Sequence, residues 1–212
     1  MTSRKVLLLR HGETEFHAEN RYAGVTDLPL NETGRRQADR VGIWAATTKI
    51  CSLWCSDLQR AIETTAPLVA ATGLNPVVDA RFRELDFGRG EGLTQANMRT
   101  EFPREREAFE TDPFANPLPL GESGSGALAR AREAFEDAID QTSSAAKDEL
   151  LVIVSHSTLL RLLVTDLIGA PLSSYRRLFP SIPPASGIAI TTNGRRAGIL
   201  AVNPDLKPGW RA

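Results

Sequence analysis

Cysteine is scarce in this sequence of 212 residues, and long apolar runs are absent. Each of these two features excludes a class of protein. The two cysteines, Cys51 and Cys55, are spaced neither as a Cys-x-x-Cys redox pair nor as a common zinc pair, so buried thiols in a reducing compartment are expected. No apolar run reaches the length of a membrane span, and the apolar segment at residues 6–9 is too short for a signal-peptide core. We therefore expect a cytoplasmic protein that does not contact a membrane.

An excess of charge of either sign is also absent. The 25 basic and 26 acidic side chains leave a formal net charge of -1, which gives no overall attraction to nucleic acid. Any binding of anions must therefore depend on individual arginines. The 42% of hydrophobic and 24% of charged residues are typical of a soluble globular protein, and the length suits one domain. We predict a single domain over residues 1–212, as a monomer or a homodimer.

Apolar runs and segments of helical periodicity alternate along the chain. Short runs typical of strands lie at residues 6–9, 52–55, 76–78, 150–154, 187–191 and 198–202, and helical spacing is found at 34–47, 57–72, about 124–143 and 158–168. Asn193-Gly194 is a strong hairpin-turn pair between the last two runs. This alternation predicts a three-layer α/β/α sandwich with a mostly parallel central sheet and an antiparallel edge element.

The periodicity weakens between Arg83 and Pro119, where four prolines occur. We predict that residues 89–120 form a small helical insertion that lies over the functional site as a lid. Phe102, Phe109 and Phe114 would form either the apolar side of this lid or a small core. Arg106 is one of three arginines that alternate with glutamates here, so a solvated helix face is expected for it.

Two of the three histidines directly follow predicted strands. His11 comes after residues 6–9 and His156 after residues 150–154, and ligands of parallel sheets bind beyond the carboxyl ends of the strands. Arg10 and Arg60 lie at similar transitions between elements, and a guanidinium group suits the oxygens of a phosphoryl group. A histidine among arginines, without a cluster of metal-binding carboxylates, favours phosphoryl transfer through a phosphohistidine.

His11 is the predicted nucleophile, because a neutral imidazole attacks phosphorus when an acceptor holds its other ring nitrogen. Gly12 would let the phosphate approach the backbone closely. Arg10, Arg60 and a protonated His156 would neutralise the oxygens of the transition state, which metal ions do in other enzymes.

Glu84 is the candidate for the group that protonates the leaving oxygen and later activates water, since its apolar neighbours would favour the protonated form. Asp86 and Glu13 are the rival carboxylates. Capping or ion pairing explains each of them better than it explains Glu84, a ranking that depends partly on the resemblance described next.

The chain resembles the histidine phosphatase superfamily in its phosphoglycerate mutase-like branch 1. The matching segments occur in the family's order: Leu9-Arg10-His11-Gly12-Glu13-Thr14, Asp27-Leu28-Pro29-Leu30, Ser56-Asp57-Leu58-Gln59-Arg60-Ala61, Arg83-Glu84-Leu85-Asp86-Phe87-Gly88, Gly121-Glu122-Ser123 and Val154-Ser155-His156. The resemblance implies His11 as the phosphorylated residue and Glu84 as the proton donor. It implies Arg10, Arg60 and His156 as the rest of the phosphate pocket, with no metal or other cofactor.

The residues expected to bind the phosphate or the rest of the substrate are Arg10, His17, Arg21, Ala23, Gly24, Arg60 and Ser157. Three of them depart from the family. His17 replaces a usual asparagine, Ser157 replaces a common glycine, and Ala23 replaces a frequent glutamine or threonine. These departures predict retained catalysis with an altered preference for the leaving group.

The segment after Glu84 resembles the phosphatase type more than the mutase type. We therefore predict a phosphoric monoester hydrolase that acts on a small phosphorylated metabolite. The alternatives are a 2,3-bisphosphoglycerate-dependent phosphoglycerate mutase and an inactive phosphate-binding or interaction module. A zinc hydrolase that uses His11, His17 and His156 is a further chemical option, which the surrounding arginines disfavour.

Overall fold

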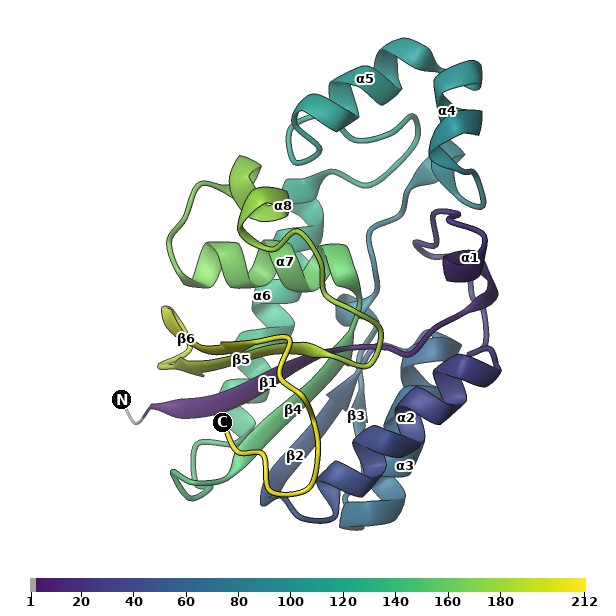
Figure 1. Ribbon diagram of the computed structural model, residues 1–212. Helices are drawn as coiled ribbons and strands as arrows, with labels where there is room; N and C mark the ends of the chain where they lie inside the picture. The colour runs from purple at the N-terminus through teal and green to yellow at the C-terminus, as the bar shows by residue number, and fades with distance from the viewer. Residues whose placement is uncertain (1–2) are drawn as a thin grey trace.

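The computed structural model describes residues 3–212 and has a six-stranded sheet between two layers of helices (Figure 1). The strands are β1 (Arg4–Arg10), β2 (Ile50–Cys55), β3 (Val77–Val78), β4 (Leu150–Ser155), β5 (Gly187–Thr192) and β6 (Ala197–Val202), in the spatial order β3-β2-β4-β1-β5-β6. The pairs β3–β2, β2–β4 and β4–β1 are parallel, whereas β1–β5 and β5–β6 are antiparallel. The predicted sandwich, with its mostly parallel sheet and antiparallel edge, is confirmed.

The helices fall close to the predicted segments. They are α1 (Glu15–Ala18), α2 (Glu32–Ala45), α3 (Gln59–Thr72), α4 (Gln95–Glu101), α5 (Pro103–Thr111), α6 (Gly124–Gln141), α7 (Ser157–Leu167) and α8 (Tyr175–Leu178), with single 3-10 turns at Ala80–Phe82, Gly88–Gly90 and Leu172–Ser174. The very short α1 and α8 were not predicted. Across residues 3–212, no helix combines the length and the apolar character needed to cross a membrane.

The alternation of side chains along β1 explains the two helical layers. Val6 and Leu8 pack with the core that contains residues of α6 and α7, and Leu7 and Leu9 pack with the core that contains residues of α2 and α3. All four side chains are fully buried. Because successive side chains of a strand point to opposite faces, an uninterrupted apolar strand requires cover on both sides.

Helices α4 and α5 stand at the top of Figure 1, apart from the sheet. Phe102 and Phe109 are buried there in a third core that also includes Met98, Leu159 and Leu162, so they join the insertion to α7. Both side chains are therefore core residues. The action of residues 89–120 as a lid stays a prediction.

Arg106 pairs with Glu110 at 2.9 Å, as the alternating charges predict, but the expectation of a solvated position was wrong. Its side chain is 2% exposed, and its Nη1 donates to the hydroxyl of Tyr22 at 2.9 Å. Its guanidinium carbon also lies 5.4 Å from the ring centroids of Tyr22 and Phe109. The periodicity of α5 gave no sign of this burial, because Tyr22 comes from a distant loop.

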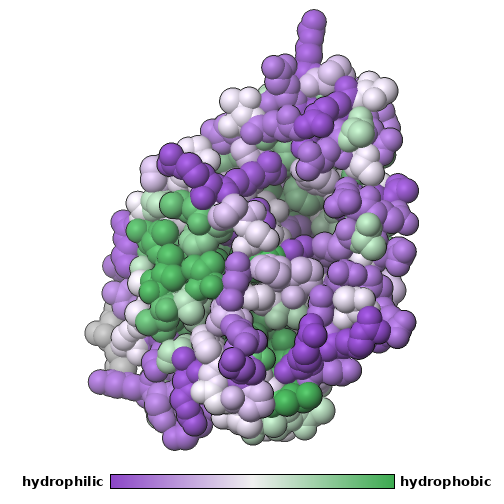
Figure 2. Space-filling view, in the orientation of Figure 1, coloured by the Kyte–Doolittle hydropathy of each residue, from purple (hydrophilic) through white to green (hydrophobic). Residues whose placement is uncertain are grey.

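Strand β6 forms an edge of the sheet and carries exposed apolar side chains. Figure 2 shows an apolar patch over the region of β5 and β6, and Ile199, Leu200 and Val202 are 42%, 44% and 45% exposed. An apolar edge strand can pair with another chain. The expectation of a monomer or a homodimer stays open at this edge.

Candidate active site

The pairing of β1 with β4 brings together two histidines from distant parts of the chain. Arg10 lies opposite Ser155 in the parallel register, so the next residues, His11 and His156, leave the sheet side by side. The backbone N–H of His11 donates to Ser155 O at 3.0 Å, and the two imidazole rings are 5.0 Å apart. The ring of His17 lies 5.3 Å from that of His11, so all three histidines of the chain meet at this end of the sheet.

His11 is held as a neutral ring with a defined tautomer. Its Nδ1 lies 2.6 Å from the carbonyl oxygen of Gly12. Because a carbonyl only accepts, Nδ1 carries the hydrogen and Nε2 keeps its lone pair. Burial lowers the pKa of His11 well below its ordinary value, and the charges around it, including those of Arg60 and Arg10, lower it further. The ring therefore has the form that a nucleophile needs.

His156 differs in its charge from the prediction. Arg60 Nε donates to its Nδ1 at 3.2 Å, so a neutral His156 carries its hydrogen on Nε2. Burial, followed by the charge of Arg60, lowers the pKa of His156 well below its usual range. The predicted cation is therefore a neutral ring in the protein without substrate. It still offers an N–H donor, since Nε2 is buried and has no partner among residues 3–212.

Arg60 is completely buried at the base of the site, where backbone carbonyls fix its plane. Its Nη1 donates to Thr26 O at 2.8 Å and its Nη2 to Gly24 O at 2.6 Å. A Cβ on Gly24 would lie 2.1 Å from Leu85 O, so this close approach of two loops requires glycine. Gly24 therefore lies behind Arg60 and supports it, whereas a direct contact with substrate had been expected.

Arg10 and His17 contact each other beside His11. Arg10 Nη2 lies 2.5 Å from His17 Nε2, and an arginine only donates, so Nε2 is an acceptor. His17 Nδ1 accepts from the backbone N–H of Thr14 at 3.2 Å and lies 2.8 Å from Thr14 Oγ1. Burial, with the charges of Arg10 and Arg60, lowers the pKa of His17 to about 3. The role of His17 as a phosphate donor stays a prediction, and it requires the contact with Arg10 to break.

Glu84 is buried and caps the N-terminus of α7. Its carboxylate accepts hydrogen bonds from the backbone N–H groups of Leu85, Thr158 and Leu159 at 3.1, 2.9 and 3.0 Å. The carboxylate is therefore surrounded by backbone hydrogen-bond donors, which the sequence did not predict, although Leu85 and Leu159 are apolar neighbours. The cause is α7, whose first N–H groups have no partner within the helix.

Arg130 of α6 holds the segment that carries Glu84, and sequence reasoning missed it. Its Nη1 donates to Arg81 O and Arg83 O, both at 2.7 Å, and its Nη2 donates to Glu84 O at 3.1 Å. The same guanidinium forms an ion pair with Glu122 at 2.8 Å. A basic residue in the middle of a helix gave no signal of this role, because its acceptors belong to a loop far away in the sequence.

Glu91 is a second support that was missed. Its Oε2 accepts from the backbone N–H groups of Gly24 and Thr26, both at 3.1 Å, and its Oε1 accepts from that of Phe87 at 3.0 Å. The carboxylate of Glu91 thus joins the loop after β1 to the segment after Glu84.

The requirement for glycine at position 12 has a different cause from the predicted one. A Cβ on Gly12 would lie 2.7 Å from the carbonyl oxygen of Gly34 in α2. The missing side chain therefore permits α2 to pack against the loop after β1. The N–H of Gly12 donates to Thr64 Oγ1 at 2.9 Å, which fixes this backbone against α3.

The rival carboxylates have the structural roles that were expected of them. Asp86 Oδ1 accepts from the N–H of Gly88 at 2.7 Å and closes a turn. Glu13 Oε1 accepts from Asn31 Nδ2 at 2.9 Å, beside the start of α2. Neither residue lines the cavity that contains His11.

That cavity has a volume of about 350 Å³ and is lined by Arg10, His11, His17, Arg21, Tyr22, Ala23, Glu84, Phe87, Gln95, Ser157, Thr158, Arg161 and Arg176. The predicted residues on its wall include Ala23, Ser157 and Arg21. Arg21 is bound to Glu19 and donates from Nη1 to Gly92 O at 2.8 Å. His156 and Arg60 lie beneath the wall, in contact with each other.

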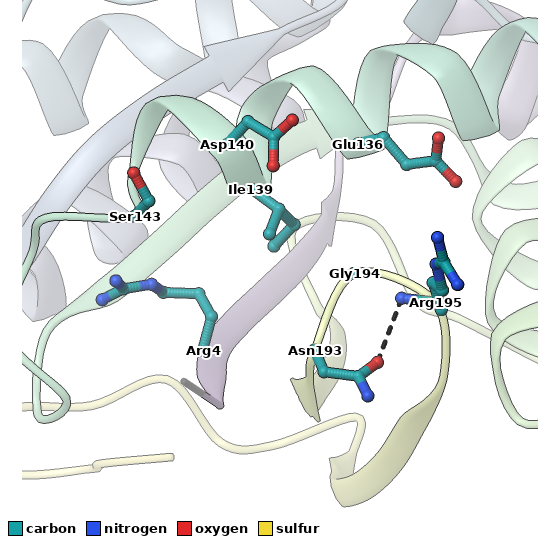
Figure 3. A pocket seen from close by; sticks show the side chains of 8 residues that line it. All are labelled: Arg4, Glu136, Ile139, Asp140, Ser143, Asn193, Gly194 and Arg195. Atoms are coloured by element: carbon teal, nitrogen blue, oxygen red, sulfur yellow. Dashed lines mark hydrogen bonds between the residues drawn. The ribbon is translucent and has the colours of Figure 1, made fainter. Parts of the chain in front are cut away.

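A second cavity of about 390 Å³ lies at the other end of β1, between α6 and the turn that joins β5 to β6 (Figure 3). Its buried Arg4 donates to the carbonyls of Ala145 and Ala146 at 3.0 and 2.9 Å, and also to that of Thr142. Asn193 accepts from the N–H of Arg195 at 3.1 Å within the turn. These polar groups bind the protein's own backbone.

Residues 3–212 contain no group of three or more His, Cys, Asp or Glu side chains placed to hold a metal ion. At the site itself, the arginines face the histidine nitrogens that a metal would need: Arg10 faces His17 Nε2 and Arg60 faces His156 Nδ1. The zinc alternative therefore lacks a convergent ligand set.

Known proteins resemble the chain over nearly its whole length. A probable phosphoglycerate mutase of Klebsiella pneumoniae is 33% identical over 82% of this chain and 79% of its own. A glucosyl-3-phosphoglycerate phosphatase of Mycolicibacterium vanbaalenii is 30% identical over 100% of this chain and 93% of its own. The solved structure of a mycobacterial glucosyl-3-phosphoglycerate phosphatase superposes with a TM-score of 0.87 at 27% identity, covering 96% of this chain and 100% of that one.

The family model for the histidine phosphatase superfamily (branch 1) matches residues 6–205. This range contains both histidines at the strand ends, Arg10, Arg60 and Glu84. The chain therefore belongs to branch 1 of the histidine phosphatase superfamily.

Proposed function

We propose that this member of a phosphatase family hydrolyses small phosphomonoesters through a phosphohistidine on His11. One observation carries the proposal: Nδ1 of His11 is fixed on Gly12 O, and Nε2 keeps a free lone pair in a ring that burial holds neutral. Arg10, Arg60 and His156 surround this nitrogen with positive charge and N–H donors, which suits an attack on a phosphate dianion.

In the first step, Nε2 of His11 attacks phosphorus while the bond from phosphorus to the ester oxygen breaks. Arg10, Arg60 and the Nε2–H of His156 neutralise the oxygens of the transferred group. Protonated Glu84 gives its proton to the leaving oxygen, so the alcohol departs uncharged.

In the second step, water attacks the phosphorus of the phosphohistidine and the P–N bond breaks. Ionised Glu84 accepts the proton that the water loses, and inorganic phosphate is released. Neutral His11 and protonated Glu84 are thereby regenerated. The backbone donors from α7 that hold Glu84 keep its carboxylate in place between its two states.

The hydrolysis of p-nitrophenyl phosphate by chelator-treated protein tests the proposal. We expect wild-type turnover to persist, and His11→Ala to lose on the order of 10⁴-fold or more in kcat because it lacks the nucleophile. Rapid acid quenching with labelled substrate should trap a phosphoprotein in the wild type and none in the variant. Turnover by His11→Ala, or its loss in the wild type on chelation, would contradict the mechanism.

A phosphoglycerate mutase is the second candidate, because a probable enzyme of that kind is 33% identical. In a mutase a phosphorylated acceptor takes the place of water in the second step. Incubation with 3-phosphoglycerate and a trace of 2,3-bisphosphoglycerate distinguishes the two. We expect inorganic phosphate as the product, and accumulation of 2-phosphoglycerate would favour the mutase.

A further inference from the structure

Two arginines on the cavity wall, Arg161 of α7 and Arg176 of α8, are not needed by the chemistry at His11. Both line the same cavity as His11 and Glu84. Arg161 Nε is buried without a hydrogen-bond partner among residues 3–212, and neither arginine forms an ion pair with a carboxylate in that range. The site thus keeps two cations that its own acids do not neutralise.

Three arginines of α5 and α6 show the alternative, because each lies beside a carboxylate. Arg106 pairs with Glu110 at 2.9 Å, Arg130 pairs with Glu122 at 2.8 Å, and Arg132 lies 3.2 Å from Glu136. A buried charge without a partner costs folding free energy. Burial correspondingly lowers the pKa of Arg161, although the nearby charge of Glu84 raises it.

Arg176 is held by aromatic rings instead of by acids. Its guanidinium carbon lies 4.7 Å from the ring centroid of Phe109, and its Nε donates to the hydroxyl of Tyr175 at 3.2 Å. These contacts fix the guanidinium on the wall and leave its charge uncompensated.

The charge of the whole cavity points in the same direction. Its lining contains four arginines and one carboxylate, Glu84. Arg21 is already paired with Glu19, and Arg10 serves the transferred phosphate. Arg161 and Arg176 therefore remain for a group other than that phosphate.

We propose that Arg161 and Arg176 bind a second anionic group of the substrate, a carboxylate or a second phosphate, and so select phosphomonoesters of acids over phosphomonoesters of neutral alcohols. A guanidinium fork matches the two oxygens of either group. The cavity volume of about 350 Å³ suits a small molecule that carries both anions. This inference rests on the proposed function, because it assumes that the substrate phosphate lies against His11.

A different role for Arg161 would be to position Glu84. However, the Glu84 carboxylate already accepts three backbone N–H groups and forms no ion pair within residues 3–212. A positioning role would affect all phosphomonoesters alike, whereas a role in substrate selection affects only those with a second anion. The experiment therefore compares matched ligands.

The matched ligands are 3-phosphoglycerate and glycerol 3-phosphate, which differ only in a carboxylate against a hydroxymethyl group. Calorimetric dissociation constants are measured in the His11→Ala background, so that neither ester is consumed. We expect 3-phosphoglycerate to bind about 10- to 100-fold more tightly, in line with charge-assisted hydrogen bonds. Arg161→Met or Arg176→Met should reduce this ratio to about threefold or less, with Arg161→Lys in between.

Arg132→Met is the matched control, because it removes an arginine of α6 that does not line the cavity, and it should keep the ratio. Fructose 1,6-bisphosphate and fructose 6-phosphate form the second arm. A preference for the bisphosphate without one for the glycerate assigns the site to a second phosphate. No preference in either pair, or equal weakening of both members by Arg161→Met, overturns the inference.

These outcomes are separate from those for the proposed function. Hydrolysis of p-nitrophenyl phosphate through His11, together with a ligand ratio near one, would refute only the second-anion site. A large ratio that depends on Arg161, in a protein that hydrolyses no phosphomonoester, would refute only the proposed hydrolysis.

Discussion

Two cavities lie at opposite ends of β1, and each has a buried arginine: Arg4 lines one, and Arg60 lies beneath the wall of the other. At the carboxyl end, Arg60 is held by two carbonyls and by His156, beneath a wall with further arginines. At the amino end, Arg4 donates hydrogen bonds to the backbone carbonyls of Thr142, Ala145 and Ala146, which follow α6. The volumes are similar, about 350 and 390 Å³. Both arginines thus bind the protein's own groups, and the carboxyl end differs in the histidines and the further arginines that lie near Arg60.

The largest expected effect is a loss of activity when Arg60, and not Arg4, is replaced. Arg60→Met should lower kcat/KM for p-nitrophenyl phosphate by about 10³-fold, because it removes a positive charge from the transition state and the donor that orients His156. Arg60→Lys keeps the charge without the fork and should lose about 10²-fold. Circular dichroism checks that both variants are folded. A folded Arg60→Met with near wild-type turnover would remove Arg60 from the mechanism.

The opposite cavity should show the reverse behaviour. Arg4→Met is expected to lower the free energy of unfolding by about 3 kcal/mol, because carbonyls at the end of α6 lose their donor inside the protein. Its kcat/KM should stay within about twofold of wild type at 25 °C. Urea denaturation gives the first number and the phosphatase assay the second. A fall in activity that matches the Arg60 variants would show that the two ends are coupled.

The smallest expected effect concerns acid stability, and it depends on His17, whose ring lies beside that of His11. His17 has a pKa of about 3 in the folded protein and near 6.5 when unfolded. Between these values the unfolded chain binds the extra proton, so stability falls as the pH falls from about 6.5 toward 3. His17→Asn should reduce the slope of the unfolding free energy against pH by at most about 1.4 kcal/mol per unit.

Urea denaturation at pH 7, 6 and 5 measures this slope. His11 and His156 remain in both proteins, so their contributions cancel in the comparison. Equal slopes would mean that His17 takes up its proton in the folded state as readily as in the unfolded one.

The strand positions and the two histidines at the strand ends could be predicted from the sequence, because each depends on a short segment of consecutive residues. An apolar run that ends in Arg10-His11 fixes where β1 stops, and the run before His156 does the same for β4. Parallel pairing then needs only that the two strands be neighbours. The core of the site follows from these two facts.

The remaining errors concern contacts between distant segments. The charge of His156 depends on its complete burial beside Arg60, and the need for glycine at position 12 depends on Gly34 of α2. Arg130 reaches the loop of Glu84 from α6. No periodicity or local motif encodes such contacts, so the supports of the site become visible only in the folded chain.

The pairing of β1 also has a consequence for the folding of this protein. β1 precedes the other five strands of the sheet along the chain, and both of its neighbours, β4 and β5, follow residue 149. The apolar residues 6–9 of β1 must therefore wait for partner strands that lie about 140 or more residues later in the sequence. Such long-range pairing slows folding and exposes apolar segments to aggregation. Since His11 meets His156 only when β1 pairs with β4, a chain that has not yet formed β4 cannot bring the two histidines together.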